Sequence, residues 1–316
     1  MPTEDPQAAA EATAQKLASE VLARRQVAHR KRAAALAKNP KKLRLSVQLQ
    51  GAPATAAVIE SAGYLVAIGD SWFDYPLWDV LKRLDDDHGY TVQSTAHYGD
   101  PVEAMAYHGG QIDGFARCVE KVLAHGIAPK AVLVSGGGND IAGQEFGMLL
   151  NSSLSPIAGW NDDVVAGALE RIRIAYRALL GGINRICQSL LNGKQLPILV
   201  HGYDYPVPDG RGFLGGGWIL PGPWLQPGFR EKAFDDLQAN TALMRRLIDN
   251  LNVMLATLAQ DKQTFPTLHY VDVRNTLSTT LTSDAYQDWW GNELHPTEKG
   301  FEAVANKFAT ALAALP

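Results

Sequence analysis

A serine that follows a buried apolar run is the residue of this chain best placed to act as a nucleophile. Residues 64–68 read Tyr-Leu-Val-Ala-Ile, which is typical of a strand covered on both faces. Ser71 comes three residues later, where the strand is expected to turn into a helix whose N-terminus favours developing negative charge. A serine hydroxyl needs a base to take its proton. We expect that base to be His295, which precedes Pro296 and a predicted helix, because imidazole titrates near neutral pH.

Two further loops carry polar or glycine-rich residues that are unusual for plain turns. Gly99 follows a predicted strand at 91–95, and Asn139 follows three glycines after a predicted strand at 131–135. The carboxyl ends of parallel strands meet at one edge of a sheet, so these loops are expected to converge there.

These residues occur in the order of the conserved blocks of the SGNH (GDSL) hydrolase superfamily, which residues 63–313 resemble. The matching segments are Gly69-Asp70-Ser71, Gly99, Gly137-Gly138-Asn139-Asp140 and His295-Pro296. The resemblance implies a serine hydrolase with Ser71 as nucleophile and His295 as base. It also implies an oxyanion hole made of the backbone N–H groups of Ser71 and Gly99 and the side-chain amide of Asn139. It implies no cofactor and no metal.

One position departs from the family pattern. The residue three before the histidine is usually Asp, and here it is Asn292. An acid there fixes the histidine tautomer and stabilises the imidazolium, whereas Asn offers a carbonyl oxygen without charge. Three explanations are open: Asn292 or a backbone carbonyl orients the histidine, a displaced carboxylate does so, or the protein is a weak or inactive relative. The carboxylates to be considered are Glu293, Asp288 and Asp284.

Strands and amphipathic helices alternate along the chain after residue 63. Further helical patterns cover 76–84, 112–125, 164–191, 232–259 and 297–315, and further strands are expected at 197–201 and 268–273. This alternation predicts an α/β fold, a three-layer sandwich with a central parallel sheet covered by helices on both faces. The resemblance implies the flavodoxin-like SGNH hydrolase form of that fold.

The N-terminal part differs in composition from the rest. Residues 1–50 hold ten Lys and Arg against four Asp and Glu, although the whole chain has a formal charge of −4. We expect residues 1–50 to be a basic, solvated or loosely docked helix followed by a linker, and residues 51–316 to be the hydrolase domain. Arg30-Lys31-Arg32 has no interleaved aromatic residues, so we expect a charged helix face and not a nucleic-acid site.

A segment rich in Gly, Pro and aromatic residues at 202–230 is expected to form a long, ordered loop beside the sheet. We expect its rings to line the substrate pocket or simply to cover the end of the sheet. The predicted pocket residues are Trp72, Tyr205, Trp218 and Trp224. The bulky Trp72 beside the nucleophile favours short acyl groups.

The two cysteines, Cys118 and Cys187, lie far apart and predict buried free thiols. The first 15 residues lack the pattern of a secretory signal, and no apolar run reaches 18 residues, so we expect a cytoplasmic protein, or one cloned without its leader. The sequence does not predict the oligomeric state.

The expected function is hydrolysis of carboxylic esters of a small-molecule, lipid or carbohydrate substrate through an acyl-enzyme. Two hypotheses from other classes stand beside it. One is a non-catalytic binding protein that docks a partner through the basic helix, and the other is an acyl transferase.

Overall fold

The computed structural model describes residues 6–37, 61–107, 110–143, 145–215 and 221–315. Trp218 and the expected linker at 41–50 lie outside these residues.

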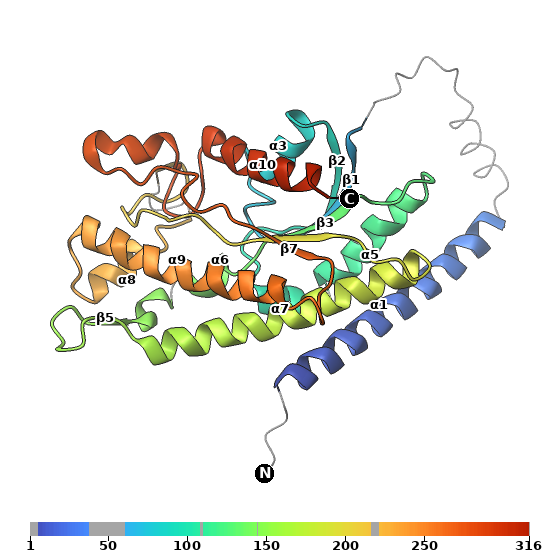
Figure 1. Cartoon of the computed structure of the whole chain (residues 1–316), viewed down its shortest axis with the longest axis horizontal. Coiled ribbons are helices and arrows are strands. Elements are labelled where there is room, and N and C mark those ends of the chain that lie inside the picture. Colours follow the sequence, from blue (N-terminus) through green and yellow to red (C-terminus); the bar gives the residue numbers. More distant parts are fainter. Residues whose placement is uncertain (1–5, 38–60, 108–109, 144, 216–220, 316) are drawn as a thin grey trace, which may run out of the picture.

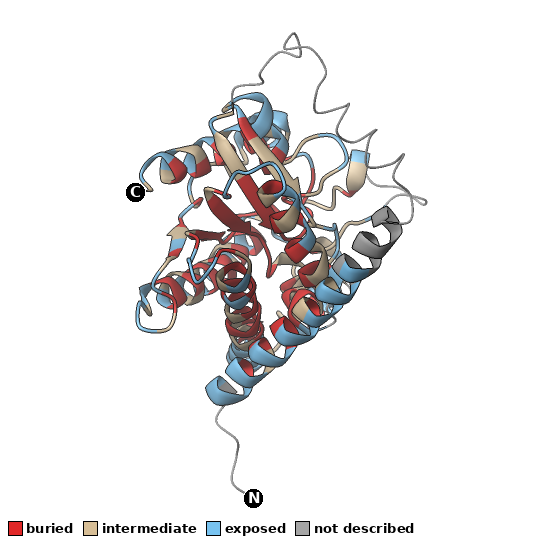
Figure 2. Cartoon of the chain, turned by 90° about the vertical axis from the view of Figure 1, so that its right-hand side faces the viewer, coloured by how far each residue is buried: buried red, intermediate tan, exposed pale blue. Residues whose placement is uncertain are grey.

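Five strands of the described residues form a parallel sheet in the order β2-β1-β3-β6-β7 (Figure 1). They are β1 (Gly63–Ile68), β2 (Tyr90–Ser94), β3 (Ala131–Val134), β6 (Ile198–His201) and β7 (Leu268–Val271). Every residue of β3 and β6 is buried, because helices cover both faces, and Figure 2 shows these strands at the centre of the molecule. Counted along the chain this is the order 2-1-3-4-5, which is the flavodoxin-like, doubly wound topology.

Helices form a layer on each face of the sheet, which confirms the predicted three-layer sandwich (Figure 1). One layer holds α3 (Val80–Asp86) and α10 (Glu298–Ala313), which pack against each other. The opposite layer holds α4 (Val102–Tyr107), α5 (Gly110–Leu123), α7 (Asp162–Leu190) and α9 (Leu237–Gln260). The strand order reverses between β1 and β3, and in such folds ligands bind outside the carboxyl ends at that point.

The N-terminal helix α1 (Pro6–Ala37) packs outside α7 and α5, so the expectation of a solvated or loosely docked helix is wrong (Figure 2). Its small and apolar side chains are buried at Ala10, Ala14, Leu17, Ala18 and Val21. A Cβ at Gly181 of α7 would lie 2.9 Å from the Cβ of Ala14, so the two helices approach closely. Two of the basic residues, Arg24 and Arg25, pair with Asp113 and Glu120 of α5.

Most element boundaries lie within a few residues of those predicted, and two differ for local reasons. Helix α3 begins at Val80 and not at Pro76, because Asp79 caps it by accepting from the N–H of Lys82. The helix predicted from residue 232 begins later: the unpredicted helix α8 (Gln226–Glu231) ends before that residue, and α9 begins after its N-cap, Asp236.

The short elements that were not predicted include α4, α6 (Gly138–Ile141), a 3₁₀ turn at Phe146–Leu149, and an antiparallel pair of β4 (Leu150–Asn151) and β5 (Gly159–Trp160). Further 3₁₀ turns lie at Phe213–Gly215 and Thr282–Asp288. Within the described ranges, no helix has the length and apolar character needed to cross a bilayer. Both cysteines are free and buried.

Candidate active site

Ser71 and His295 lie in hydrogen-bond contact although 224 residues separate them in sequence. The Nε2 atom of His295 is 2.8 Å from the Oγ atom of Ser71. Both residues are largely buried, with 9% and 6% of their surfaces exposed. Ser71 stands in the turn after β1, and His295 in the loop that leads into α10. A neutral imidazole at this distance can accept the serine proton.

The side chain of Asn292 holds the other nitrogen of that ring. Its Oδ1 atom lies 3.1 Å from Nδ1 of His295 and also accepts the backbone N–H groups of Leu294 and His295, each at 2.9 Å. These backbone donors identify Oδ1 as the atom that faces the ring, so Nδ1 carries the proton and Nε2 faces Ser71 as an acceptor. The Nδ2 atom of Asn292 donates to the hydroxyl of Tyr75 at 2.9 Å.

This geometry excludes the alternative in which Glu293, Asp288 or Asp284 orients the histidine. The Glu293 carboxylate accepts four backbone N–H groups at 2.6–3.0 Å, from Gly210, Trp224, Leu225 and Gln226. It therefore points away from the imidazole and ties the 202–230 loop to the histidine loop. Asp288 and Asp284 are exposed, and Asn292 is the residue that contacts Nδ1 of His295.

The nucleophile turn is held by the buried carboxylate of Asp70. Its Oδ1 accepts the Ser135 hydroxyl at 2.6 Å and the Trp72 N–H at 3.1 Å, and its Oδ2 accepts the Tyr203 hydroxyl. Burial raises the pKa of Asp70, and these hydrogen bonds oppose that rise. Gly69 is required here, because a Cβ would lie 2.8 Å from the Cβ of Ser135.

A second tie joins the serine turn directly to the histidine loop. The indole N–H of Trp72 donates to the carbonyl of Leu294 at 3.0 Å. The Trp72 ring is buried among His201, Tyr203, Trp290 and Phe301. Trp72 therefore fixes the distance between the two loops as well as lining the site.

The three predicted oxyanion donors come from neighbouring loops at the same sheet edge. Gly99 has a φ of +83°, which favours glycine. Among the described residues, no acceptor is bonded to the backbone N–H of Ser71 or Gly99. Asn139 uses one amide hydrogen on the Asp100 carbonyl at 3.2 Å, which leaves the second for a ligand.

Gln111 of α5, which the sequence analysis did not select, connects two of these loops. Its amide bonds to both the N–H and the carbonyl of Gly69, at 3.1 and 3.0 Å, and donates to the Asp100 carboxylate at 2.6 Å. In sequence Gln111 is a polar residue in an amphipathic helix, so nothing distinguishes it from a surface position. Only its burial in the structure identifies it.

A cavity of about 40 Å³ opens beside the nucleophile. Ser71, Trp72 and Asn139 line it, and most of the remaining wall is apolar, including Ile141, Leu225, Met244 and Ile248. About 10–15 Å³ of such space holds one water molecule, so this cavity fits a group of about three heavy atoms.

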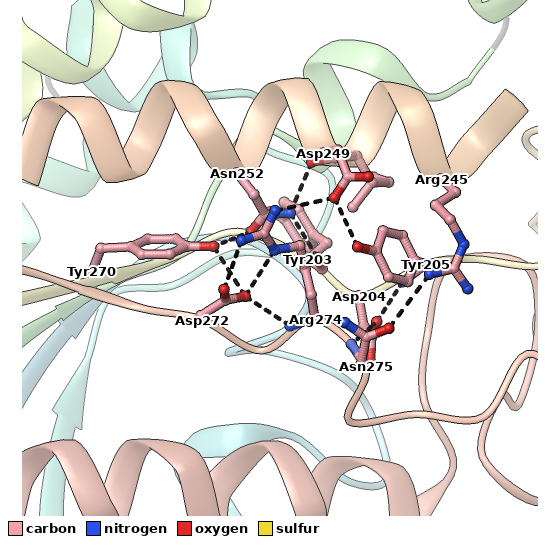
Figure 3. A network of polar contacts seen from close by, with 11 residues as sticks. Tyr203, Asp204, Tyr205, Arg245, Asp249, Asn252, Tyr270, Asp272, Arg274 and Asn275 are labelled. Carbon is pink, nitrogen blue, oxygen red and sulfur yellow. Dashed lines mark hydrogen bonds and ion pairs between the residues drawn. The ribbon is translucent and has the colours of Figure 1, made fainter. Parts of the chain in front are cut away.

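The predicted pocket residues have different positions. Trp72 lines the cavity, and Trp224 contacts the His295 ring edge to face with centroids 5.6 Å apart. Tyr205 does not line it, so that prediction is wrong: its hydroxyl donates to Asp249 at 2.7 Å and its ring lies under the Arg245 guanidinium (Figure 3). The neighbouring Asp204 is buried and accepts backbone N–H groups of residues 275–277, which holds the 202–207 segment in place.

Tyr75 was also missed, although it lies four residues after the nucleophile. Its ring stacks on the His295 ring with centroids 4.2 Å apart and an angle of 19° between the planes. The run Trp72-Phe73-Asp74-Tyr75-Pro76 was the available signal, because aromatic residues beside a nucleophile are positioned to contact its base.

Burial lowers the pKa of His295 from its ordinary value of 6.5 to about 3. The ring is therefore neutral at physiological pH, as a general base must be. Burial also raises the pKa of Asp140, next to Asn139, to about 6, and its carboxylate accepts the N–H of Val102 at 2.9 Å. Within the described ranges, no three His, Cys, Asp or Glu side chains are grouped so as to hold a metal ion.

No family model matches the chain, and no curated protein matches it. Solved structures give distant likenesses. An acetylxylan esterase from Geobacillus stearothermophilus is 16% identical, with a TM-score of 0.42, over 80% of this chain and 95% of that chain. A carbohydrate acetylesterase from Sinorhizobium meliloti is 14% identical, with a TM-score of 0.45, over 80% of this chain and 100% of that chain.

A third likeness is to the catalytic domain of a peptidoglycan O-acetyltransferase from Streptococcus pneumoniae. It is 11% identical, with a TM-score of 0.34, over 81% of this chain and 94% of that chain. Likenesses this distant assign no activity to this chain.

The structural role of Glu293 leads to a test. Glu293→Gln places an amide against backbone N–H donors, and we expect it to lower the free energy of unfolding by about 3 kcal/mol, since bonds to a charged acceptor contribute about 1.5–3 kcal/mol each. Denaturant unfolding measures the change. Glu298→Gln is the matched control, because the Glu298 side chain is 52% exposed. Equal stability of the two variants would contradict this role for Glu293.

Proposed function

We propose that this protein is a serine esterase that hydrolyses short-chain, acetyl-sized esters. The observation that carries the proposal is the hydrogen-bonded series Asn292–His295–Ser71, with its serine in the wall of a small apolar cavity. A nucleophile, a base oriented by a third group, and free N–H donors nearby are the parts that acyl transfer requires.

The first half of the reaction forms an acyl-enzyme. The Ser71 Oγ attacks the ester carbonyl carbon while His295 Nε2 takes the hydroxyl proton. The carbonyl oxygen becomes an oxyanion within reach of the N–H groups of Ser71 and Gly99 and the amide of Asn139. When the tetrahedral intermediate collapses, its bond to the alcohol oxygen breaks, and His295 returns the proton to the departing alcohol.

The second half releases the acid. Water attacks the acyl carbon as His295 Nε2 accepts a proton from it, and the ester bond to Ser71 then breaks with return of that proton to Oγ. The acyl group occupies the 40 Å³ cavity in both halves, and the alcohol part lies outside it. That volume supports an acetyl group and favours it over a long chain.

Ser71 is tested most directly by covalent labelling. A fluorophosphonate probe should label the wild-type protein but not Ser71→Ala, and hydrolysis of p-nitrophenyl acetate should fall by at least about 1,000-fold, because the nucleophile is lost. Ser189→Ala, an exposed serine on α7, is the matched control and should behave as the wild type. A wild-type protein that is neither labelled nor active would favour the binding-protein hypothesis. Faster product formation on adding alcohol acceptors would indicate a transferase.

Cavity size gives a prediction for acyl preference. The wild type should cleave p-nitrophenyl acetate better than butyrate and should scarcely cleave palmitate. Met244→Ala removes part of the cavity wall and should raise kcat/KM for butyrate relative to acetate by about tenfold, as expected for one or two methylenes. Leu247→Ala, on the same helix and buried but outside the cavity, should leave the ratio unchanged. A wild-type preference for palmitate would refute the assignment.

The pH dependence of kcat/KM tests whether the partner of His295 is uncharged. The base must be neutral, so activity is lost as pH falls through its pKa, and with a pKa of about 3 the acid limb of kcat/KM should lie below pH 5. Asn292→Asp adds a negative charge that favours the imidazolium, which should move the limb up by about 1–3 pH units. Asn292→Leu should lower kcat by about 100-fold or more through loss of orientation. An acid limb near pH 6.5 in the wild type, unmoved by Asn292→Asp, would contradict this account.

A further inference from the structure

The imidazole of His295 is enclosed by two aromatic rings. Tyr75 lies face to face with it at 4.2 Å, and Trp224 approaches at 75° with centroids 5.6 Å apart. Tyr75 is itself held between Phe213 and Phe301, with centroids at 5.7 and 5.9 Å, so its ring has a defined position over the histidine.

Among the described residues, no carboxylate forms a hydrogen bond or an ion pair with this imidazole. Its hydrogen-bond and ring partners are Ser71, Asn292, Tyr75 and Trp224, and none of these is an anion. Burial raises the pKa of the Tyr75 hydroxyl to about 12, so this group is also neutral at working pH. A transition state in which His295 becomes a cation therefore receives no stabilisation from a charged neighbour.

An aromatic face can supply part of that stabilisation. A cation within about 6 Å of a ring centroid is attracted by the negative face of the ring, most strongly where water is excluded. The His295 ring is 4.2 Å from the Tyr75 centroid in a site where it is 6% exposed, so this condition is met once the imidazole is protonated.

The hydroxyl of the same tyrosine holds the residue that orients the histidine. Asn292 is 1% exposed, and its Nδ2 donates to the Tyr75 hydroxyl. Without that acceptor a buried amide N–H would lose its recorded partner, while Oδ1 would still face three donors. Tyr75 thus contacts both the base and its orienting group.

We propose that Tyr75 is a positioning residue that replaces the absent carboxylate, with its ring face stabilising the His295 imidazolium and its hydroxyl anchoring Asn292. This inference rests on the proposed esterase function and deepens it. It assigns the two effects to separate parts of one side chain, the ring and the hydroxyl, so they can be removed one at a time.

The experiment compares Tyr75→Phe and Tyr75→Leu in the wild-type and Asn292→Asp backgrounds, with p-nitrophenyl acetate as substrate and fluorophosphonate labelling rates as a second readout. Tyr75→Phe should lower kcat by about tenfold through loss of the hydroxyl bond. Tyr75→Leu should lower it by about a further tenfold through loss of the ring face. KM should stay within about twofold, since neither part lines the cavity.

The Asn292→Asp background separates this role from a merely structural one. A carboxylate beside Nδ1 stabilises the imidazolium directly, so the further loss on going from Tyr75→Phe to Tyr75→Leu, which removes the ring face, should be less than about threefold there. Tyr205→Phe is the matched control, because it also loses one tyrosine hydroxyl bond, to Asp249 (Figure 3), and Tyr205 does not line the cavity. It should leave kcat unchanged in both backgrounds.

An equal further loss from Tyr75→Phe to Tyr75→Leu in the two backgrounds would overturn the inference, as would losses no larger than that of Tyr205→Phe. Thermal denaturation of each variant checks that it is folded, and Tyr75→Phe keeps the packing against Phe213 and Phe301 if Tyr75→Leu does not fold. If only the inference fails, the wild type is still labelled at Ser71. An unlabelled wild type would instead overturn the proposed function together with the inference.

Discussion

The carboxyl ends of β1 and β3 lie side by side where the strand order of the sheet reverses, and the geometry of the site depends on that register. Ile68 pairs with Val134, so the turn holding Ser71 and the loop holding Asn139 leave the sheet at the same level. Asp70 joins them by accepting the Ser135 hydroxyl, and Gln111 joins the first turn to the Gly99 loop. The histidine loop, which follows no strand directly, is brought to this edge by the bond from Trp72 to the Leu294 carbonyl.

The buried acidic side chains near the site have structural roles. Asp70, Asp204 and Glu293 are each at most 1% exposed, and each accepts several hydrogen bonds from loop backbone or hydroxyl donors. A buried carboxylate bonded in this way fixes the loops around it, because loss of any donor leaves the charge less compensated. Because these carboxylates are hydrogen-bonded to the loops, none of them contacts His295, and the surroundings of the imidazole are uncharged.

A neutral environment has a chemical consequence for the proposed reaction. His295 is available as a base over a wide pH range, but each proton it accepts creates an isolated cation in a buried site. The groups able to offset that cost are the Asn292 carbonyl oxygen, at 3.1 Å, and the aromatic rings of Tyr75 and Trp224. In the proposed mechanism, the aromatic residues beside the nucleophile and the asparagine that replaces the usual acid have the same role, which is to stabilise the His295 imidazolium.

The sequence by itself determined the layer architecture and the pairing of Ser71 with His295, because apolar periodicity reports burial and the motif order reports which loops carry polar groups. It left open what orients the imidazole, since Asn292, Glu293 and Asp288 are near one another in sequence and only side-chain direction separates them. From the sequence we also expected α1 to be solvated or loosely docked and Tyr205 to line the pocket, and both expectations were wrong. The roles of Tyr75 and Gln111 were overlooked. Each of those depends on which surface a side chain meets, a contact between segments distant in the chain that only the tertiary structure decides.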